Sequence, residues 1–508
     1  MSEVLSCDPP ALPLLAAADL DAPLAWRGSQ AISARQFLAD AAQQAAQLPA
    51  TGPLVNLCSD RYRFDAPLAW RGSQAISARQ FLADAAQQAA QLPATGPLVN
   101  LCSDRYRFAV GLAAALLRGQ TSLLPPNALP DTLARLRGPY PALHALTDDD
   151  GLAVAGLPLL RAPRSPAAVG AGAVVVPRID ARLEAACLLT SGSTGAPQPH
   201  AKSWGALVTN IRAEAQRLAE VLERPSLAGL NLVATVPAQH SYGFESSVLL
   251  ALLGGAAFDS GRPFYPADIV QALERLPRPR ALVTTPFHLK TLLLAGVALP
   301  PTDLLLCATA PLSPQLALQA ERAFGGPLVE IYGCTEAGQV ATRRTVHGEV
   351  WQTFGALRIR RDGGGEHERF IVEGGHVQQP TPLADVLQLD SAQRFRLLGR
   401  ANDLIHVAGK RSSLSHLNYH LNSIEGVVDG AFWLPADVAD GVVRPVAFVV
   451  APGLSTAQIS AALRERLEPV FVPRRVLHVD ALPREATGKL TTQALARFAQ
   501  AQLGRAKR

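Results

Sequence analysis

The sequence is poor in sulfur and in aromatic side chains. Its 508 residues include six cysteines and one methionine, and Phe, Trp and Tyr together make up 6%. No two cysteines have the CxxC spacing of a zinc or redox site. Cys187 and Cys307 stand in apolar runs, which predicts buried, reduced thiols that behave as small hydrophobic residues.

The chain also lacks the features of export, membrane insertion and nucleic-acid binding. Residues 1–6 have neither the basic nor the apolar region of a secretory signal. The longest apolar stretch, near residues 248–258, is too short to cross a bilayer and contains Gly254-Gly255. The net charge is +5, with no dense stripe of Lys and Arg among aromatics. We therefore expect a cytoplasmic protein that binds neither membrane nor nucleic acid.

What the chain has is a long alternation of strand-like and helix-like runs, which predicts an α/β layer fold. Residues 98–102 and 281–285 read as buried strands, residues 78–92 as a helix capped by Ser77, and residues 108–117 as a further helix. From about residue 403 a smaller α/β unit begins. Its predicted elements are a helix over 413–424, a strand over 445–450 and a helix over 456–467.

One segment occurs twice without a single difference, as residues 21–64 and again as residues 65–108. Solenoid repeats diverge and number at least three, so this is a tandem duplication of another kind. The second copy runs on into the following strand and loop. We expect the second copy to be integrated in the fold and the first to be redundant.

A loop rich in small residues, Thr-Ser-Gly-Ser-Thr-Gly-Ala-Pro-Gln at 190–198, follows an apolar run at 185–189. Small residues let backbone N–H groups converge on an anion, and hydroxyl groups add donors. The loop is therefore a candidate phosphate cradle, although Ser/Gly/Thr loops also serve as plain linkers.

Four further motifs follow this loop along the chain. They are Tyr332-Gly-Cys-Thr-Glu336, then Asp385, then Gly399-Arg400-Ala-Asn402-Asp, and last Thr487-Gly-Lys489-Leu. In order and approximate spacing the set resembles the adenylate-forming superfamily, which includes acyl- and aryl-CoA ligases, adenylation domains and luciferases. The resemblance covers roughly residues 95–495.

The resemblance implies a large, multi-layer N-terminal adenylation domain over residues 1–398 and a small, mobile α/β C-terminal domain over 399–508. It also implies ATP and Mg²⁺ as cofactors. The β- and γ-phosphates would lie against the loop residues Ser191, Gly192, Ser193, Thr194 and Gly195. The family usually has Lys directly after the loop proline, whereas this chain has Gln198 there and Lys202 four residues on.

The other nucleotide contacts are likewise carried over position by position. Tyr332 would stack on adenine, Glu336 would ligate Mg²⁺, Asp385 would bind the ribose hydroxyls, and Arg400 would bind ribose or phosphate. Ala310 and Pro311 would line the cleft, in a segment where Ala308 and Thr309 replace two family glycines. From the residues alone, Tyr332 also suits a strand-end core position, and Glu336 a solvated helix start.

The resemblance assigns catalysis to Lys489, His240 and Thr335. Lys489 would reach the carboxylate and the α-phosphate, His240 would lie beside the acyl pocket, and Thr335 would meet the phosphates. Asn402 stands where the family has its hinge residue. A surface turn at Gly488-Lys489 and a hydrogen-bonded loop histidine are the plainer alternatives.

The implied activity is activation of a carboxylic acid by ATP, followed by transfer to a thiol. The loop sequence resembles ligases of aryl-polyene and xanthomonadin-type pigment clusters, which load a hydroxybenzoate-like acid onto an acyl carrier protein. Free CoA as the acceptor is the first alternative, and a catalytically inactive nucleotide-binding protein is the second. A nicotinamide oxidoreductase is excluded, because Gly170-Ala-Gly172 lacks a third glycine at Val175.

Overall fold

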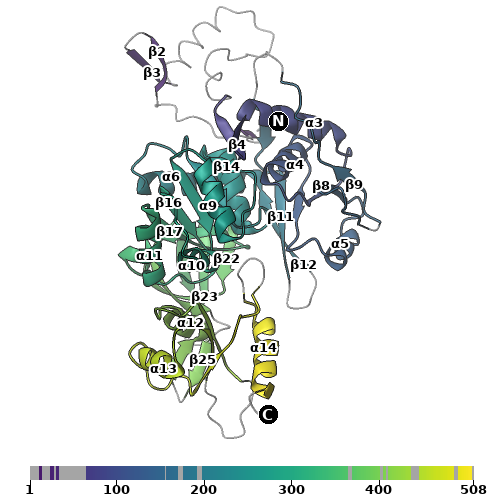
Figure 1. Ribbon diagram of the computed structural model, residues 1–508. Coiled ribbons are helices and arrows are strands. Elements are labelled where there is room, and N and C mark those ends of the chain that lie inside the picture. Colours follow the sequence, from purple (N-terminus) through teal and green to yellow (C-terminus); the bar gives the residue numbers. More distant parts are fainter. Residues whose placement is uncertain are drawn as a thin grey trace, which may run out of the picture. The chain divides into compact units, whose positions relative to one another are not determined.

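A computed structural model of the protein describes residues 11–13, 23–27, 30–33, 65–154, 156–169, 176–191, 197–363, 369–400, 404–407, 410–435, 445–484 and 490–505. It is an α/β fold, whose elements Figure 1 labels, and the chain divides into two compact units. Unit 1 comprises residues 1–232 and 238–262, and unit 2 comprises residues 233–237 and 263–508.

Unit 1 contains a six-stranded sheet in the order β12-β11-β7-β6-β8-β9. All neighbours run parallel except the pair β11–β12, which is antiparallel. The strands are β6 (Leu98–Asn100), β7 (Ser122–Leu124), β8 (His144–Thr147), β9 (Leu159–Arg161), β11 (Glu184–Ser191) and β12 (Pro197–Ser203). Val99, Leu123 and Cys187 bury one face of this sheet together with α5 (Pro130–Arg137).

The second copy of the duplicated segment supplies a hairpin and a helix to unit 1. The hairpin consists of β4 (Pro67–Arg71) and β5 (Gln74–Ser77), and β4 pairs with β14 (Ala257–Asp259), which in turn pairs with β13 (Asn231–Ala234). Ser77 caps α3 (Ala78–Gln91) by accepting a hydrogen bond from the Gln80 amide, as the sequence predicts.

The next helix, α4 (Arg105–Leu117), begins three residues before its expected start at residue 108. The Asp104 carboxylate accepts a hydrogen bond from the Arg107 amide and so caps the earlier start. The end of the copy, Phe108, and the first unique residue, Ala109, are both fully buried inside this helix.

The first copy contributes the hairpin β2 (Pro23–Arg27) and β3 (Gln30–Ser33). Its register, with Trp26 opposite Ala31 and Arg27 opposite Gln30, is the register of β4–β5 shifted by one copy length. Upstream, β1 (Ala11–Pro13) pairs with β10 (Arg178–Asp180). Whether the first copy is redundant stays a prediction.

Unit 1 also holds the long helix α6 (Trp204–Val221), which packs on α8 (Leu250–Gly254). Between α7 (Ser241–Gly243) and α8 the chain forms a π-helix, η1 (Phe244–Leu249), all of whose residues are buried. Turns of π-helix inside α-helical segments occur frequently at functional sites.

Unit 2 contains strands hydrogen-bonded in the order β23-β24-β19-β18-β17-β16-β15. Strands β15, β16 and β17 run parallel and the others antiparallel. They are β15 (Arg280–Thr284), β16 (Leu304–Cys307), β17 (Leu328–Cys334), β18 (Gly338–Arg343), β19 (Val350–Thr353), β23 (Asp385–Ser391) and β24 (Arg394–Arg400).

Three helices and a small sheet complete this part of unit 2. The helices are α9 (Pro266–Arg275), α10 (Pro286–Leu294) and α11 (Pro314–Phe324). The sheet has the order β20-β21-β22, and a short 3₁₀ turn, η2 (Thr345–His347), follows β18. Its strands are β20 (Arg358–Asp362), β21 (Arg369–Gly374) and β22 (Val377–Leu383).

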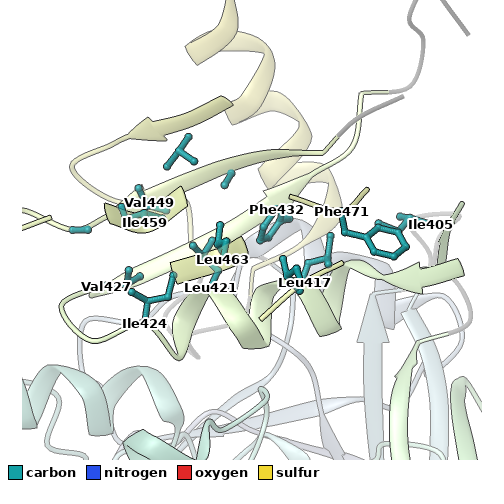
Figure 2. Close-up of a cluster of buried hydrophobic side chains, with 14 of the residues drawn as sticks. Ile405, Leu417, Leu421, Ile424, Val427, Phe432, Val449, Ile459, Leu463 and Phe471 are labelled. Atoms are coloured by element: carbon teal, nitrogen blue, oxygen red, sulfur yellow. The ribbon is translucent and has the colours of Figure 1, made fainter. Parts of the chain in front are cut away.

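The C-terminal part of unit 2 has its own hydrophobic core, shown in Figure 2, in which Leu417, Leu421, Ile459 and Phe432 are fully buried. Its elements are β25 (Leu404–Val407), β26 (Lys410–Ser413), α12 (Leu414–Asn422), β27 (Asp429–Trp433), β28 (Val446–Val450), α13 (Thr456–Arg464), β29 (Arg475–His478) and α14 (Thr492–Arg505). The two helices and the strand expected here are present with slightly shorter bounds.

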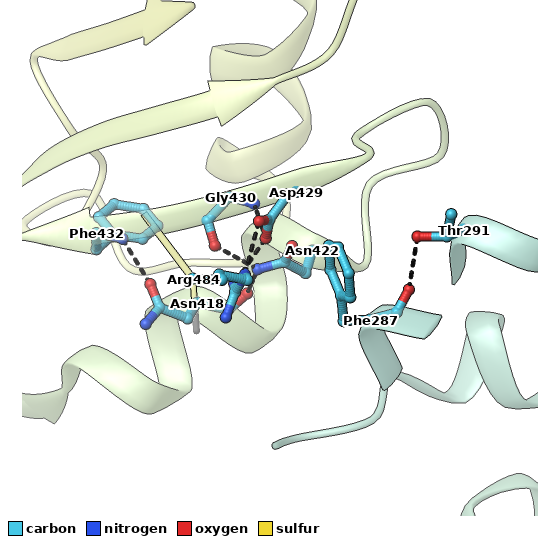
Figure 3. A network of polar contacts seen from close by, with 8 residues as sticks. All are labelled: Phe287, Thr291, Asn418, Asn422, Asp429, Gly430, Phe432 and Arg484. Atoms are coloured by element: carbon cyan, nitrogen blue, oxygen red, sulfur yellow. Dashed lines mark hydrogen bonds and ion pairs between the residues drawn. The ribbon is translucent and has the colours of Figure 1, made fainter. Parts of the chain in front are cut away.

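A polar network lies beside this core (Figure 3). The Arg484 guanidinium donates to both oxygens of Asp429, each at 2.7 Å, and the Asn422 amide donates to the Gly430 carbonyl.

The described residues include no helix that is both long and apolar enough to cross a membrane. Cys187 and Cys307 are buried, as expected.

Candidate functional site

Three residues that the sequence predicts to bind the nucleotide lie close together near the end of β17. The Tyr332 hydroxyl donates a 2.7 Å hydrogen bond to Asp385, the first residue of β23. The backbone of Arg400 lies opposite Asp385 in the β23–β24 pair. The Tyr332 ring itself is buried and packs against Trp351 and Phe395, at centroid distances of 5.6 and 5.5 Å.

Thr335 and Glu336 lie in the tight turn from β17 to β18. Gly333 lies in β17 just before this turn, and a Cβ there would lie 2.3 Å from the Gly338 carbonyl oxygen, so only glycine fits. Thr335 is half-buried and Glu336 is exposed. Mg²⁺ in nucleotide sites is commonly held by one or two carboxylates plus substrate phosphates, so an exposed glutamate suits it. The described residues contain no cluster of three or more His, Cys, Asp and Glu that could hold a metal.

The segment after β16 carries a strained backbone. Thr309 has a φ of +82°, in the left-handed region that favours glycine, and a β-branched residue there is an outlier. Half-buried Ala310 and exposed Pro311 follow it. The chain therefore has threonine at 309 in a backbone conformation that a glycine takes without strain.

The candidate phosphate loop connects β11 and β12, whose antiparallel pairing extends to Ser191 opposite Pro197. Thr190 Oγ1 and His200 Nε2, 3.0 Å apart, join the two strands near the loop. Of the predicted cradle, Gly192, Ser193, Thr194 and Gly195 lie outside the described residues. So do the hinge residue Asn402 and the catalytic Lys489, and their roles stay predictions.

His240 directly precedes α7 in unit 1 and is half-buried, and its carbonyl accepts a 2.7 Å hydrogen bond from the Phe244 amide. The preceding residue, Gln239, lines a cavity of about 100 Å³. Arg105, Arg262, Asn100 and Asn127 are among its other lining residues. The residue before His240 therefore lines a small cavity whose walls include arginine and asparagine side chains as well as apolar residues.

Two buried charged residues of unit 1 were not among the candidate site residues predicted from the sequence. Lys202 on β12 is 8% exposed, and Glu245 in the π-helix is 1% exposed. Burial raises the pKa of Glu245 to about 7, against the opposing effects of the Lys202 charge and of hydrogen bonds with Asn210 and Ser241. The sequence offered one signal for Lys202. The lysine that usually follows the loop proline is replaced by Gln198, and Lys202 stands four residues further on.

Comparison with known families gives two matches. The family of AMP-binding enzymes matches residues 139–360, and the AMP-binding enzyme C-terminal domain matches residues 435–489.

Among curated proteins, the chain is 31% identical over 304 residues to a 4-coumarate–CoA ligase of Rhodobacter capsulatus, covering 59% of this chain and 73% of the relative. It is 27% identical over 267 residues to a 4-hydroxybenzoate–CoA/benzoate–CoA ligase of Rhodopseudomonas palustris, covering 44% and 49%. Among solved structures, o-succinylbenzoate–CoA synthetase of Bacillus subtilis with ATP and magnesium has a TM-score of 0.68 at 18% identity, covering 83% and 95%.

Proposed function

The chain belongs to the AMP-binding enzymes and is an ATP-dependent, AMP-forming acid–thiol ligase, and on that premise we propose that its acid is an aryl acid of the hydroxybenzoate type. We further propose that the activated acyl group passes to the thiol of an acyl carrier protein. The enzyme uses ATP and Mg²⁺, and ATP supplies the adenylyl group that activates the carboxylate.

The Tyr332–Asp385 pair is the observation that carries the proposal of a nucleotide site. A carboxylate that is held at one oxygen by a phenol keeps acceptor capacity for the two ribose hydroxyls. In the proposal, adenine would lie against the small exposed part of Tyr332, a residue that is 9% exposed. Glu336 is exposed in the turn between β17 and β18, and its carboxylate suits the magnesium ion that accompanies the phosphates.

The reacting groups are proposed by position in the family motif. Attack of one anion on another requires charge neutralisation and alignment, because both the carboxylate and the α-phosphate are negative. In the proposal Lys489 neutralises the developing charge, and His240 lies beside the bound acid. Rotation of the C-terminal domain about Asn402 would then withdraw Lys489 and admit the thiol.

Two observations support an aryl acid and a carrier protein. The relatives named above are ligases of 4-coumarate and of 4-hydroxybenzoate or benzoate, and each of these acids carries an aromatic ring. Four exposed arginines of the C-terminal part would attract an acidic carrier protein. They are Arg464, Arg466, Arg474 and Arg475.

Free CoA is the second candidate acceptor, because the relatives are named as CoA ligases. A test uses the purified full chain and measures pyrophosphate release over a panel of aryl and aliphatic acids. Each acid is paired with CoA or with a holo acyl carrier protein. We expect the highest rate with a hydroxybenzoate and the carrier protein. A preference for aliphatic acids with CoA would overturn both finer proposals.

A further inference from the structure

A row of side chains crosses the sheet of unit 2 beside Tyr332. In the pair β17–β18, Glu330 lies opposite Arg343, and in the pair β19–β24, Trp351 lies opposite Phe395. Strand β18 pairs with β19, so these four residues come from four adjacent strands. Tyr332 follows Glu330 by two positions on β17, and side chains two positions apart on a strand point to the same face. The row and the tyrosine therefore share one face of the sheet.

The row begins with a buried ion pair. Arg343 Nε and Nη2 each lie 2.7 Å from Glu330 Oε2, and the Thr345 hydroxyl donates to the same oxygen at 2.8 Å. The side chains of Arg343 and Glu330 are 12% and 5% exposed. A pair of charges at this depth is favourable only when its geometry is good and further hydrogen bonds accompany it, and both conditions are met here. The guanidinium is therefore held in one place.

The guanidinium of Arg343 in turn contacts Trp351. Its Cζ atom lies 4.5 Å from the centre of the Trp351 ring, which is a cation–π distance. Trp351 is 2% exposed, and its ring stacks with Phe395 at a centroid distance of 6.4 Å and an interplanar angle of 12°. The indole is thus contacted by a cation from one neighbouring strand and by an aromatic ring from the other.

Tyr332 packs its ring on this row and uses its hydroxyl for Asp385. Its ring is tilted by 56° to that of Trp351 and by 64° to that of Phe395. The hydroxyl donates to Asp385 at 2.7 Å. Because a phenol is rigid, a shift of the ring moves the hydroxyl with it. The packing on the ring therefore affects how well the hydroxyl meets the carboxylate.

We propose that Trp351 and Arg343 are positioning residues, which keep the Tyr332 phenol on its carboxylate partner and thereby set the affinity for MgATP. Trp351 acts on the tyrosine ring, and Arg343 acts through Trp351. The inference rests on the proposed function and deepens it, because it assigns further residues to the nucleotide side of the same site.

The test measures ATP–pyrophosphate exchange with the preferred acid at varied MgATP. We expect Trp351→Leu to raise KM for MgATP about tenfold, with kcat and KM for the acid changed less than about threefold. Trp351→Phe keeps an aromatic ring against Tyr332 and should stay within about twofold of the wild type. Arg343→Lys keeps a charge beside Glu330 but loses the planar guanidinium over the indole, and should raise KM for MgATP about fivefold.

The double variant Trp351→Leu/Arg343→Lys tests whether the two residues act along one path. Independent effects multiply, which would give a rise of about fiftyfold, whereas effects along one path should give no more than about fifteenfold. Arg344→Met is the matched control. It breaks the neighbouring 2.7 Å ion pair with Glu321 of α11 and should leave KM for MgATP unchanged.

Three kinetic results would overturn the inference. The first is an unchanged KM for MgATP in both Trp351→Leu and Arg343→Lys. The second is a rise in Trp351→Phe as large as in Trp351→Leu, since an aromatic ring at 351 would then make no difference. The third is a fiftyfold rise in the double variant, which would separate Arg343 from Trp351.

A second measurement is independent of turnover. In calorimetric titration, the Kd for ATP should rise about tenfold in Trp351→Leu and about fivefold in Arg343→Lys. If Trp351→Leu does not fold, an unchanged Kd in Arg343→Lys still rejects the inference. If the wild type exchanges pyrophosphate with none of the acids, the proposed function fails, and the Kd values still decide the positioning role.

Discussion

The Tyr332 hydroxyl donates to Asp385 across 53 residues of sequence, and this single 2.7 Å contact joins the ends of β17 and β23. The two strands are not neighbours, because β18, β19 and β24 lie between them in the sheet order. The contact therefore holds a carboxylate in place beside the buried tyrosine ring of the candidate nucleotide site. In the proposed function, this carboxylate would bind the ribose hydroxyls of ATP.

Substitutions of Tyr332 and Asp385 should weaken the binding of MgATP. We predict that Asp385→Ala raises KM for MgATP by about 10- to 100-fold, because two charge-assisted hydrogen bonds to the ribose are lost. Tyr332→Phe should raise it only a few-fold, since the hydroxyl acts through the carboxylate. ATP–pyrophosphate exchange at varied ATP measures both. Asp390→Asn, on the same strand and paired with Arg396, is the control and should match the wild type.

Lys489 should be needed for chemistry and dispensable for nucleotide binding. We predict that Lys489→Ala lowers the rate of adenylate formation by at least about 10²-fold, because the developing charge loses its counter-ion. Calorimetric titration with ATP should give a Kd within a few-fold of the wild type. Retained adenylate formation in this variant would reject the assigned role, and a wild type without turnover would favour a nucleotide-binding protein.

The strained threonine offers a test on stability. Thr309 has a φ of +82°, which costs a β-branched residue about 1–3 kcal/mol, whereas glycine takes this conformation without strain. We predict that Thr309→Gly raises the free energy of unfolding by about 1 kcal/mol after the entropic cost of glycine. Chemical denaturation measures the change. The neighbouring Ala310→Gly has no such strain to relieve and should lower stability.

Lys290 should make the stability depend on pH above neutrality. Its amine is buried, has no hydrogen-bond partner among the described residues, and has a pKa lowered by burial to about 8. The nearby Asp429 opposes this shift and Arg484, its partner in Figure 3, adds to it. Between pH 8 and 10.5, the ordinary pKa of a lysine amine, the unfolded chain binds more protons, so stability rises with pH.

We therefore predict that Lys290→Met is more stable than the wild type at pH 7, by roughly 1–3 kcal/mol. The advantage should shrink above pH 8 and vanish near pH 10.5, where the unfolded lysine also loses its proton. Urea denaturation over this range measures it. A stability difference that is constant with pH would contradict the titration of Lys290.

The duplication predicts a dispensable segment. A chain without residues 21–64 retains every residue that builds β4, β5, α3, β6 and α4. We expect it to keep its thermal unfolding temperature and its exchange activity. Trp26→Ala and Trp70→Ala form a matched pair in identical local sequence. Only Trp70→Ala should lower stability, because the Trp70 indole donates to Asn231 at 2.7 Å. Equal losses in the two variants would contradict the prediction.

Local sequence predicted the elements well where a cap or an apolar run decides the structure, as at Ser77 before α3. It missed the start of α4, because the capping role of Asp104 was not recognised. The motif order identified Tyr332 and Asp385, but their contact depends on how distant strands pair. The inward direction of Lys202 depends on the β11–β12 register, which shifts between Glu184 and Ala186. Sequence alone does not give such a shift.

The second copy of the duplicated segment ends at Phe108, inside α4, and this position distinguishes it from the identical first copy. Phe64 and Phe108 close the same string of residues, but only Phe108 continues into the apolar Ala109–Leu117 stretch that completes a buried helix. Excising either copy from the gene yields one and the same polypeptide. In the full chain, only the continuation of the sequence after Phe108 distinguishes the second copy. If the first copy is redundant, as predicted, substitutions within residues 21–64 should be tolerated.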